Sequence, residues 1–120
     1  MTNLVAMTIA ILLHVEPGYG SNDHGQAAGD LQEHTCMVRE VNRLIAVNHI
    51  PHLKFTYHDR LDRQKSLEMA QIYLTWAAKH YRITDPRVLA YRWRNPKTGH
   101  PPKWYKVRVQ SAYQAILRGE

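Results

Sequence analysis

The chain has 120 residues, a net charge of +6 and one cysteine. This length is typical of a single domain that buries a core without disulfides, and one cysteine cannot form a disulfide within the chain. An apolar content of 44% and a charged content of 22% exclude an intrinsically disordered chain. A single cysteine favours a reducing compartment, and we expect Cys36 to be a small buried hydrophobe on a helix.

The apolar N-terminus, MTNLVAMTIAILL, has no basic residue before it. A membrane-spanning helix needs about 20 apolar residues, and a secretory signal begins with positive charge. We therefore expect no transmembrane or targeting segment, and a cytoplasmic protein. Residues 1–7 are expected to be a disordered tip. The aliphatic run Thr8–Val15 is expected to be a strand that is buried on both faces.

The middle of the chain predicts two helices and a strand between them. The first helix starts near Glu33, because four apolar residues recur at helical spacing: Met37, Val41, Leu44 and Ile45. Alternation predicts a strand over His52–His58. A long helix over 59–81 is expected to be capped by Asp59 or Asp62. One of its apolar stripes could contact a protein partner: Met69, Ile72, Tyr73 and Trp76.

The last third of the chain predicts a basic β-hairpin over 82–109. Two arms rich in β-branched and aromatic residues, RVLAYRW and KWYKVRV, flank the loop NPKTGHPP. A short helix, SAYQAIL, follows. The complete order β-α-β-α-β-β-α predicts an α/β fold, in which one small domain over residues 1–120 has a sheet with helices packed on its faces.

Charge is distributed unevenly along the chain. Residues 1–34 contain four acids and no Lys or Arg, whereas the rest contains all 16 basic side chains and six acids. The second part therefore favours an anionic partner.

In the predicted hairpin, strand alternation places arginines and lysines together on one face. Like charges that face each other across a hairpin repel unless an anion covers them, and phosphates bind such a face with release of counterions. We therefore predict a small, non-catalytic nucleic-acid-binding protein that contacts the phosphates of DNA or RNA. Another polyanion, or an ordinary solvated strand face, is the alternative. The predicted site residues are Arg92, Arg94, Lys97, Lys103, Trp104, Lys106 and Arg108.

Histidines and acids crowd the segment from His14 to His34. These residue types are ligands for zinc, but their spacing matches no helical i,i+4 pair, so we expect no metal. If zinc is present, we expect Glu33 with His14 or His24 to bind it. A carboxylate pair of Glu16 and Glu33 for acid–base chemistry is a further alternative, although Glu33 can equally cap a helix.

The stretch EPGYGSNDHG…LQE resembles the opening motif of the zinc-dependent N-acetylmuramoyl-L-alanine amidases, which are cell-wall hydrolases of the Asp-Pro-Gly-His-Gly-Gly type. The resemblance extends over residues 9–95. It implies an α/β fold, a first strand that ends in the motif, and a zinc-binding Glu at Glu33. Tyr19 and Trp93 stand where the family has its two zinc histidines, and neither ring replaces an imidazole as a ligand. The resemblance therefore implies a degenerate or rearranged hydrolase module. Independently of this resemblance, a structural subunit of a larger assembly is a third alternative for the function.

Overall fold

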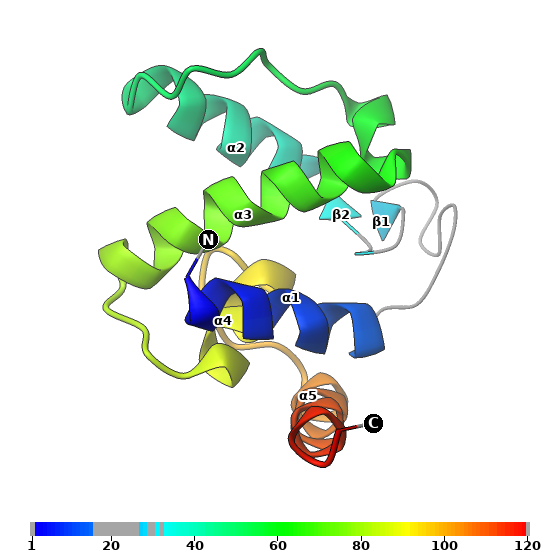
Figure 1. The fold of residues 1–120 in the computed structure, drawn as a ribbon. Coiled ribbons are helices and arrows are strands. Elements are labelled where there is room, and N and C mark those ends of the chain that lie inside the picture. The colour runs from blue at the N-terminus through cyan, green and yellow to red at the C-terminus, as the bar shows by residue number, and fades with distance from the viewer. Residues whose placement is uncertain (1, 16–26, 29–30, 32, 120) are drawn as a thin grey trace. The chain divides into compact units, whose positions relative to one another are not determined.

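The structure is a computed structural model that describes residues 2–15, 27–28, 31 and 33–119 (Figure 1). Its elements are α1 (Asn3–Val15), β1 (Ala27–Ala28), β2 (Glu33–His34), α2 (Thr35–Val47), the 3-10 helix η1 (Tyr57–Leu61), α3 (Arg63–His80), α4 (Pro86–Arg94) and α5 (Lys103–Leu117). The two-residue strands pair antiparallel, with Ala27 opposite His34. The predicted α/β fold is wrong, because within the described ranges every regular element is a helix except this one short pair of strands.

Helix α1 occupies the aliphatic run that we expected to be a strand. Its buried residues are Val5, Thr8, Ile9, Ile11, Leu12 and Val15. A run without polar interruptions has no periodicity, so it suits a buried helix as well as a buried strand. The hydroxyl of Thr8 donates to the Leu4 carbonyl at 2.8 Å, which satisfies this buried polar group within the helix. The helix begins at Asn3, inside the stretch for which we expected disorder.

None of the helices among the described residues is long and apolar enough to cross a membrane. Helix α1, although apolar, has only 13 residues.

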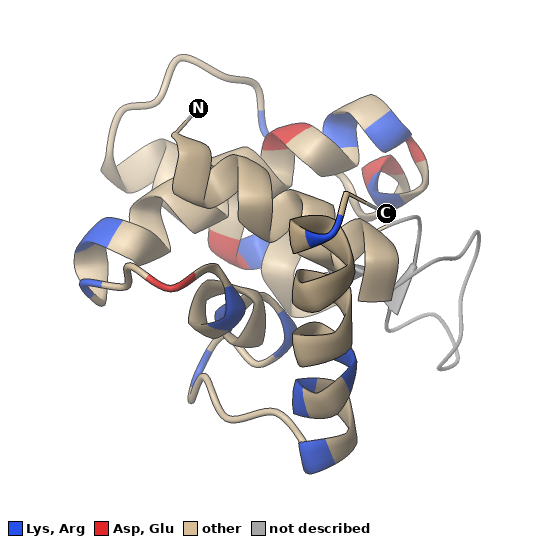
Figure 2. Cartoon of the chain, turned by 60° about the horizontal axis from the view of Figure 1, so that its bottom comes forward, with Lys and Arg blue, Asp and Glu red and all other residues tan. Residues whose placement is uncertain are grey.

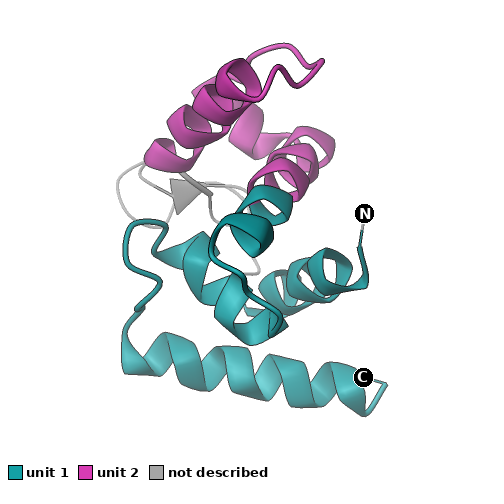
Figure 3. Cartoon of the chain, turned by 90° about the vertical axis from the view of Figure 1, so that its left-hand side faces the viewer, with its two compact units in different colours: residues 1–15, 74–120 teal, residues 16–73 magenta. Residues whose placement is uncertain are grey.

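The chain divides into two compact units, which Figure 3 shows in teal and magenta. Unit 1 comprises residues 1–15 and 74–120, and unit 2 comprises residues 16–73. In unit 1, α1 packs against α4 and α5. The core of this unit includes Leu12, Leu89, Trp93, Tyr105 and Val109, each at most 3% exposed. Trp93 is therefore a core residue of unit 1.

Unit 2 contains α2, η1 and the first part of α3. The predicted apolar stripe of α2 is confirmed, because Met37, Val41, Leu44 and Ile45 are all buried. The predicted burial of Cys36 is wrong, since its side chain is exposed on the same helix.

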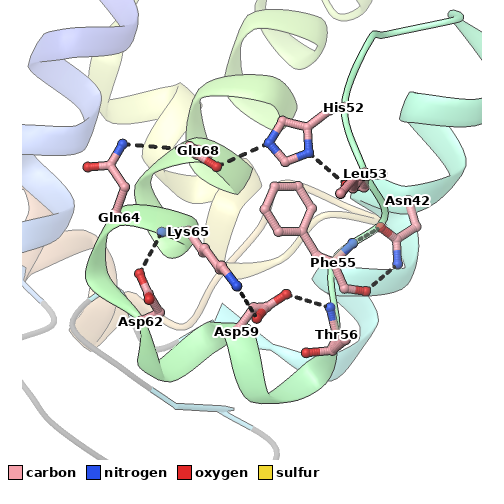
Figure 4. Close-up of polar contacts among 10 residues, drawn as sticks. All are labelled: Asn42, His52, Leu53, Phe55, Thr56, Asp59, Asp62, Gln64, Lys65 and Glu68. Carbon is pink, nitrogen blue, oxygen red and sulfur yellow. Dashed lines mark hydrogen bonds and ion pairs between the residues drawn. The ribbon is translucent and has the colours of Figure 1, made fainter.

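The strand predicted over His52–His58 is also wrong. Leu53 is 86% exposed, and the segment leads into η1. One side chain pairs with the backbone groups that a neighbouring strand would satisfy. The Asn42 amide nitrogen donates to the Phe55 carbonyl at 2.9 Å, and the Phe55 N–H donates to the Asn42 Oδ1 at 2.8 Å (Figure 4). This segment therefore stays extended and buries Phe55 without joining a sheet.

Helix α3 confirms the long helix predicted for the middle of the chain. Of the two predicted capping residues, Asp62 caps α3, whereas Asp59 caps the preceding 3-10 helix η1. Asp59 accepts a hydrogen bond from the Thr56 N–H at 2.8 Å, and Asp62 accepts one from the Lys65 N–H at 3.0 Å (Figure 4). The first bond also lowers the pKa of Asp59.

The predicted β-hairpin over 82–109 is replaced by α4, a connection at 95–102, and α5. Helix α4 begins at Pro86, and the side chain of Asp85 caps it by accepting the Arg87 N–H at 2.9 Å. Asp85 and Pro86 therefore begin α4, in addition to following the end of α3. The buried residues have helical spacing: Leu89, Ala90 and Trp93 in α4, and Tyr105, Val109 and Ala112 in α5.

Candidate nucleic-acid interface

All seven predicted site residues belong to α4, the 95–102 connection or α5, within unit 1. Between Asp85 and Glu120 the sequence has eight basic residues and no acid. Figure 2 shows basic segments and no acidic ones along α5. The structure sorts these basic residues into groups with different surroundings.

Arg92 stabilises the connection between the two helices. Its guanidinium lies over the Tyr81 ring, with Cζ 3.8 Å from the ring centre. Its Nη1 donates to the carbonyls of Pro96 and Lys97 at 3.1 and 3.4 Å. The connection passes so close that a Cβ at Gly99 would lie 2.7 Å from the Arg92 Nε. We therefore assign Arg92 to the fold of the connection rather than to phosphate contacts.

Arg87 forms an ion pair with the acid that precedes α4. Its guanidinium donates to the two carboxylate oxygens of Asp85 at 3.0 and 2.7 Å, and to the Gln110 side chain at 2.9 Å. These side-chain bonds from Arg87 lower the pKa of Asp85. This ion pair was not predicted from the sequence. The Asp85 carboxylate that caps α4 accepts from the Arg87 N–H, and this cap also places the carboxylate beside the Arg87 side chain. Because Asp85 is paired with Arg87, it does not neutralise the positive charges of α5.

Two other arginines meet at an exposed indole. Trp104 is 51% exposed, and the Cζ atoms of Arg108 and Arg94 lie 5.1 and 5.9 Å from its ring centre. Trp104 and Arg108 are neighbours on α5 because they are four residues apart, whereas Arg94 comes from the end of α4. With the adjacent exposed Lys103, these residues form what we call the Trp104 cluster: Arg94, Lys103, Trp104 and Arg108.

Lys106 does not share the face of the Trp104 cluster. Two residues along an α-helix correspond to a turn of about 200°, so Lys106 lies on the other side of α5 from Trp104. Its Nζ lies 5.5 Å from the ring centre of Tyr91. The prediction that the arginines and lysines share one face is therefore wrong for Lys106 and Arg108, because it assumed the alternation of a strand.

Four of the remaining cations have no acidic partner within the part of the chain that the structure describes. Among the residues that the structure describes, no carboxylate pairs with Lys97, Lys103, Lys106 or Arg108; the ion pairs involve residues elsewhere in the chain. Lys97 and Lys103 are exposed. Positive charge thus remains available on the connection and at the start of α5.

The predicted zinc ligands are only partly described. His14 is exposed on α1, while His24, Glu16 and the side chain of Glu33 lie outside the described residues. Within the ranges that are described, no three His, Cys, Asp or Glu side chains are grouped so as to hold a metal. The zinc set and the carboxylate pair stay predictions.

The apolar stripe predicted to contact a protein partner is partly core. Met69 and Tyr73 are at most 1% exposed. Ile72 and Trp76 are half-buried, and the Trp76 ring stacks on His80 with centres 4.5 Å apart. Only half of the stripe is therefore accessible to a partner.

Unit 2 contains a polar cluster that no sequence pattern predicts (Figure 4). The Nδ1 of His52 lies 2.6 Å from the Leu53 carbonyl oxygen, and its Nε2 lies 3.1 Å from the Glu68 Oε2. Gln64 donates to the other Glu68 oxygen at 3.3 Å. The cluster ties the extended segment before η1 to α3, and we assign it a structural role.

Comparisons with protein-family models, with curated proteins and with solved structures found no match to this chain. The amidase resemblance therefore stays a resemblance of short motifs.

Proposed function

We propose that this protein binds nucleic acid by contacting its phosphates, without catalysis, through the Trp104 cluster and the exposed Lys97. The observation that carries this proposal is the meeting of Arg94 and Arg108, from two helices, at the exposed ring of Trp104. Arginine presents a planar fork that matches phosphate, and an exposed aromatic ring offers a stacking surface.

The distribution of acids supports a polyanionic partner. Residues 86–119 contain no acid, and Asp85, which directly precedes them, is paired with Arg87. A polyanion that covers this surface therefore meets little local repulsion. Neutralisation of each phosphate releases condensed counterions, which supplies affinity without reading sequence.

A salt titration of binding tests the proposal. We expect the affinity for DNA or RNA to fall linearly with salt on logarithmic axes. The double variant Lys103→Ala/Arg108→Ala removes two phosphate contacts and should make the slope for duplex DNA shallower by about 1.8. The matched control is Arg39→Ala/Lys54→Ala, which removes two exposed cations from unit 2 and should leave the slope unchanged. Fluorescence anisotropy of a labelled oligonucleotide measures both.

An affinity that does not change with salt, or equal losses in the two double variants, would contradict the proposal. Bound zinc is assayed on the same sample by elemental analysis. Stoichiometric zinc that is lost in Glu33→Ala, together with no binding of nucleic acid, would instead favour the rearranged hydrolase implied by the amidase resemblance.

A further inference from the structure

Trp104 is the one exposed tryptophan of the three in the chain. Trp93 is 3% exposed in the core of unit 1, and Trp76 is half-buried against His80. Trp104, in contrast, leaves 51% of its surface open at the second position of α5. Exposing so large an apolar ring is unfavourable in water, so a ligand that covers it gains free energy from burial as well as from charge.

The neighbours of Trp104 orient its ring without closing it off. Tyr105 contacts it edge-on, with ring centres 5.8 Å apart and planes at 82°. The guanidinium groups of Arg108 and Arg94 lie 5.1 and 5.9 Å from the ring centre. Both distances lie within the roughly 6 Å over which a cation is attracted to an aromatic ring, and the indole nevertheless remains 51% exposed.

Single-stranded and duplex nucleic acids differ in what they can offer this ring. In a duplex the faces of the bases are stacked on one another, and only their edges are open in the grooves. An unpaired base presents its whole face to an aromatic side chain. A surface that used charge alone would favour the duplex, whose phosphates are more densely spaced. An exposed ring flanked by guanidinium groups therefore fits a single strand better.

We infer that the Trp104 cluster binds single-stranded nucleic acid, with an unpaired base stacked on Trp104 and the adjacent phosphates bound by Arg94 and Arg108. This inference rests on the proposed function and specifies the class of its ligand. Because every base has a flat face, the site accepts bases of any kind.

The experiment compares an oligothymidylate with a DNA duplex of the same length, using the full chain at low salt. Trp104→Ala should weaken binding of the single strand by about 5- to 150-fold, which is the range for loss of one stacking aromatic residue. Binding of the duplex should change far less. Trp104→Phe should retain most of the affinity, because it keeps an aromatic ring. Val107→Ala, which truncates an exposed apolar residue on the same helix, is the matched control and should have no effect.

The outcomes separate this inference from the proposed function. Salt-dependent binding that is equal for the two ligands and insensitive to Trp104→Ala would overturn the inference and leave the proposed function standing. No binding of either ligand at low salt would overturn both. Binding of purified cell-wall glycan strands in place of nucleic acid, lost in Trp104→Ala and independent of salt, would assign the indole to a carbohydrate and would also overturn both.

Discussion

His52 is held between two hydrogen-bond acceptors. The Leu53 carbonyl faces its Nδ1, and the Glu68 carboxylate faces its Nε2. A neutral imidazole has one N–H and satisfies only one of these acceptors, whereas the imidazolium satisfies both. The hydrogen bond to Leu53, followed by that to Glu68, therefore raises the pKa of His52 above its ordinary value of 6.5.

This arrangement predicts a stability that depends on pH. Because the pKa of His52 is higher in the folded state, its contribution is fully present below the unfolded pKa, near 6.5, and is lost as pH rises through the folded pKa. We expect His52→Gln to lower the free energy of unfolding at about pH 5.5 and to have a smaller effect at about pH 8.5. Urea denaturation measures both values.

The control for this prediction is His58→Gln, at an exposed residue of η1 for which the structure shows no hydrogen bond from the side chain. It controls for the loss of an imidazole from the surface, so the loss of stability in His52→Gln should exceed that in His58→Gln at about pH 5.5. A difference between wild type and His52→Gln that grows as pH rises would contradict the prediction.

The 95–102 connection depends on one glycine. Gly99 adopts φ +72°, and a Cβ there would lie 2.7 Å from Nε and 3.0 Å from Cζ of Arg92. Adding a methyl group would therefore strain the backbone and displace the guanidinium that lies over Tyr81 and binds the carbonyls of the connection. The turn at Gly99 and the contact of Arg92 with Tyr81 therefore depend on each other.

We expect Gly99→Ala to lower the free energy of unfolding by about 1–2 kcal/mol, measured by urea denaturation followed by circular dichroism. Gly119→Ala separates the two causes. Gly119 also has a positive φ, +81°, but nothing lies within 4 Å of its added Cβ. Gly119→Ala should therefore lower the free energy of unfolding by less than Gly99→Ala does. An equal decrease in both variants would show that the contact with Arg92 has no role.

Sequence patterns predicted some elements and not others for identifiable reasons. Helices α2 and α3 were predicted because polar residues separate their apolar ones at helical spacing. Helix α1 has too few polar residues to show any period. In α4 and α5 the buried residues do have helical spacing, but arginine, valine and aromatic residues alternate along the same stretches and suggested strands.

The candidate site was predicted in composition but not in arrangement. The excess of positive charge and the presence of Trp104 follow from the sequence. The grouping of Trp104 with Arg108 follows from helical geometry, and the separation of Lys106 from them has the same cause. The role of Arg92 depends on Tyr81 and on the path of the connection, which no local pattern indicates.

At the scale of the whole molecule, unit 1 is assembled from two separate parts of the chain. Helix α1 contributes Ile11 and Leu12, both 0% exposed, to a core that also contains Leu89 and Val109. The hydroxyl of Thr8 additionally lies 3.4 Å from the Pro86 carbonyl oxygen, at the start of α4. The packing of α4 and α5, and with it the Trp104 cluster, therefore depends on residues about 80 positions earlier in the sequence.

Leu12→Ala tests this dependence. We expect it to lower the free energy of unfolding by about 2–5 kcal/mol, because it leaves a cavity in the core of unit 1. Leu13→Ala, at the adjacent and partly exposed position, should lower the free energy of unfolding by less. Chemical denaturation monitored by tryptophan fluorescence reports on this unit, since Trp76, Trp93 and Trp104 all belong to it. Similar losses for the two variants would contradict the assignment of Leu12 to the core.

The division of unit 1 between distant segments also affects how the protein is made. Helix α1 leaves the ribosome before unit 2, and the whole of unit 2 is synthesised before α4 and α5 emerge to cover α1. At typical rates of elongation this apolar helix waits for several seconds without its partners. During translation, the nascent chain therefore presents an aliphatic surface to chaperones, and a premature stop before α4 would leave a product prone to aggregation.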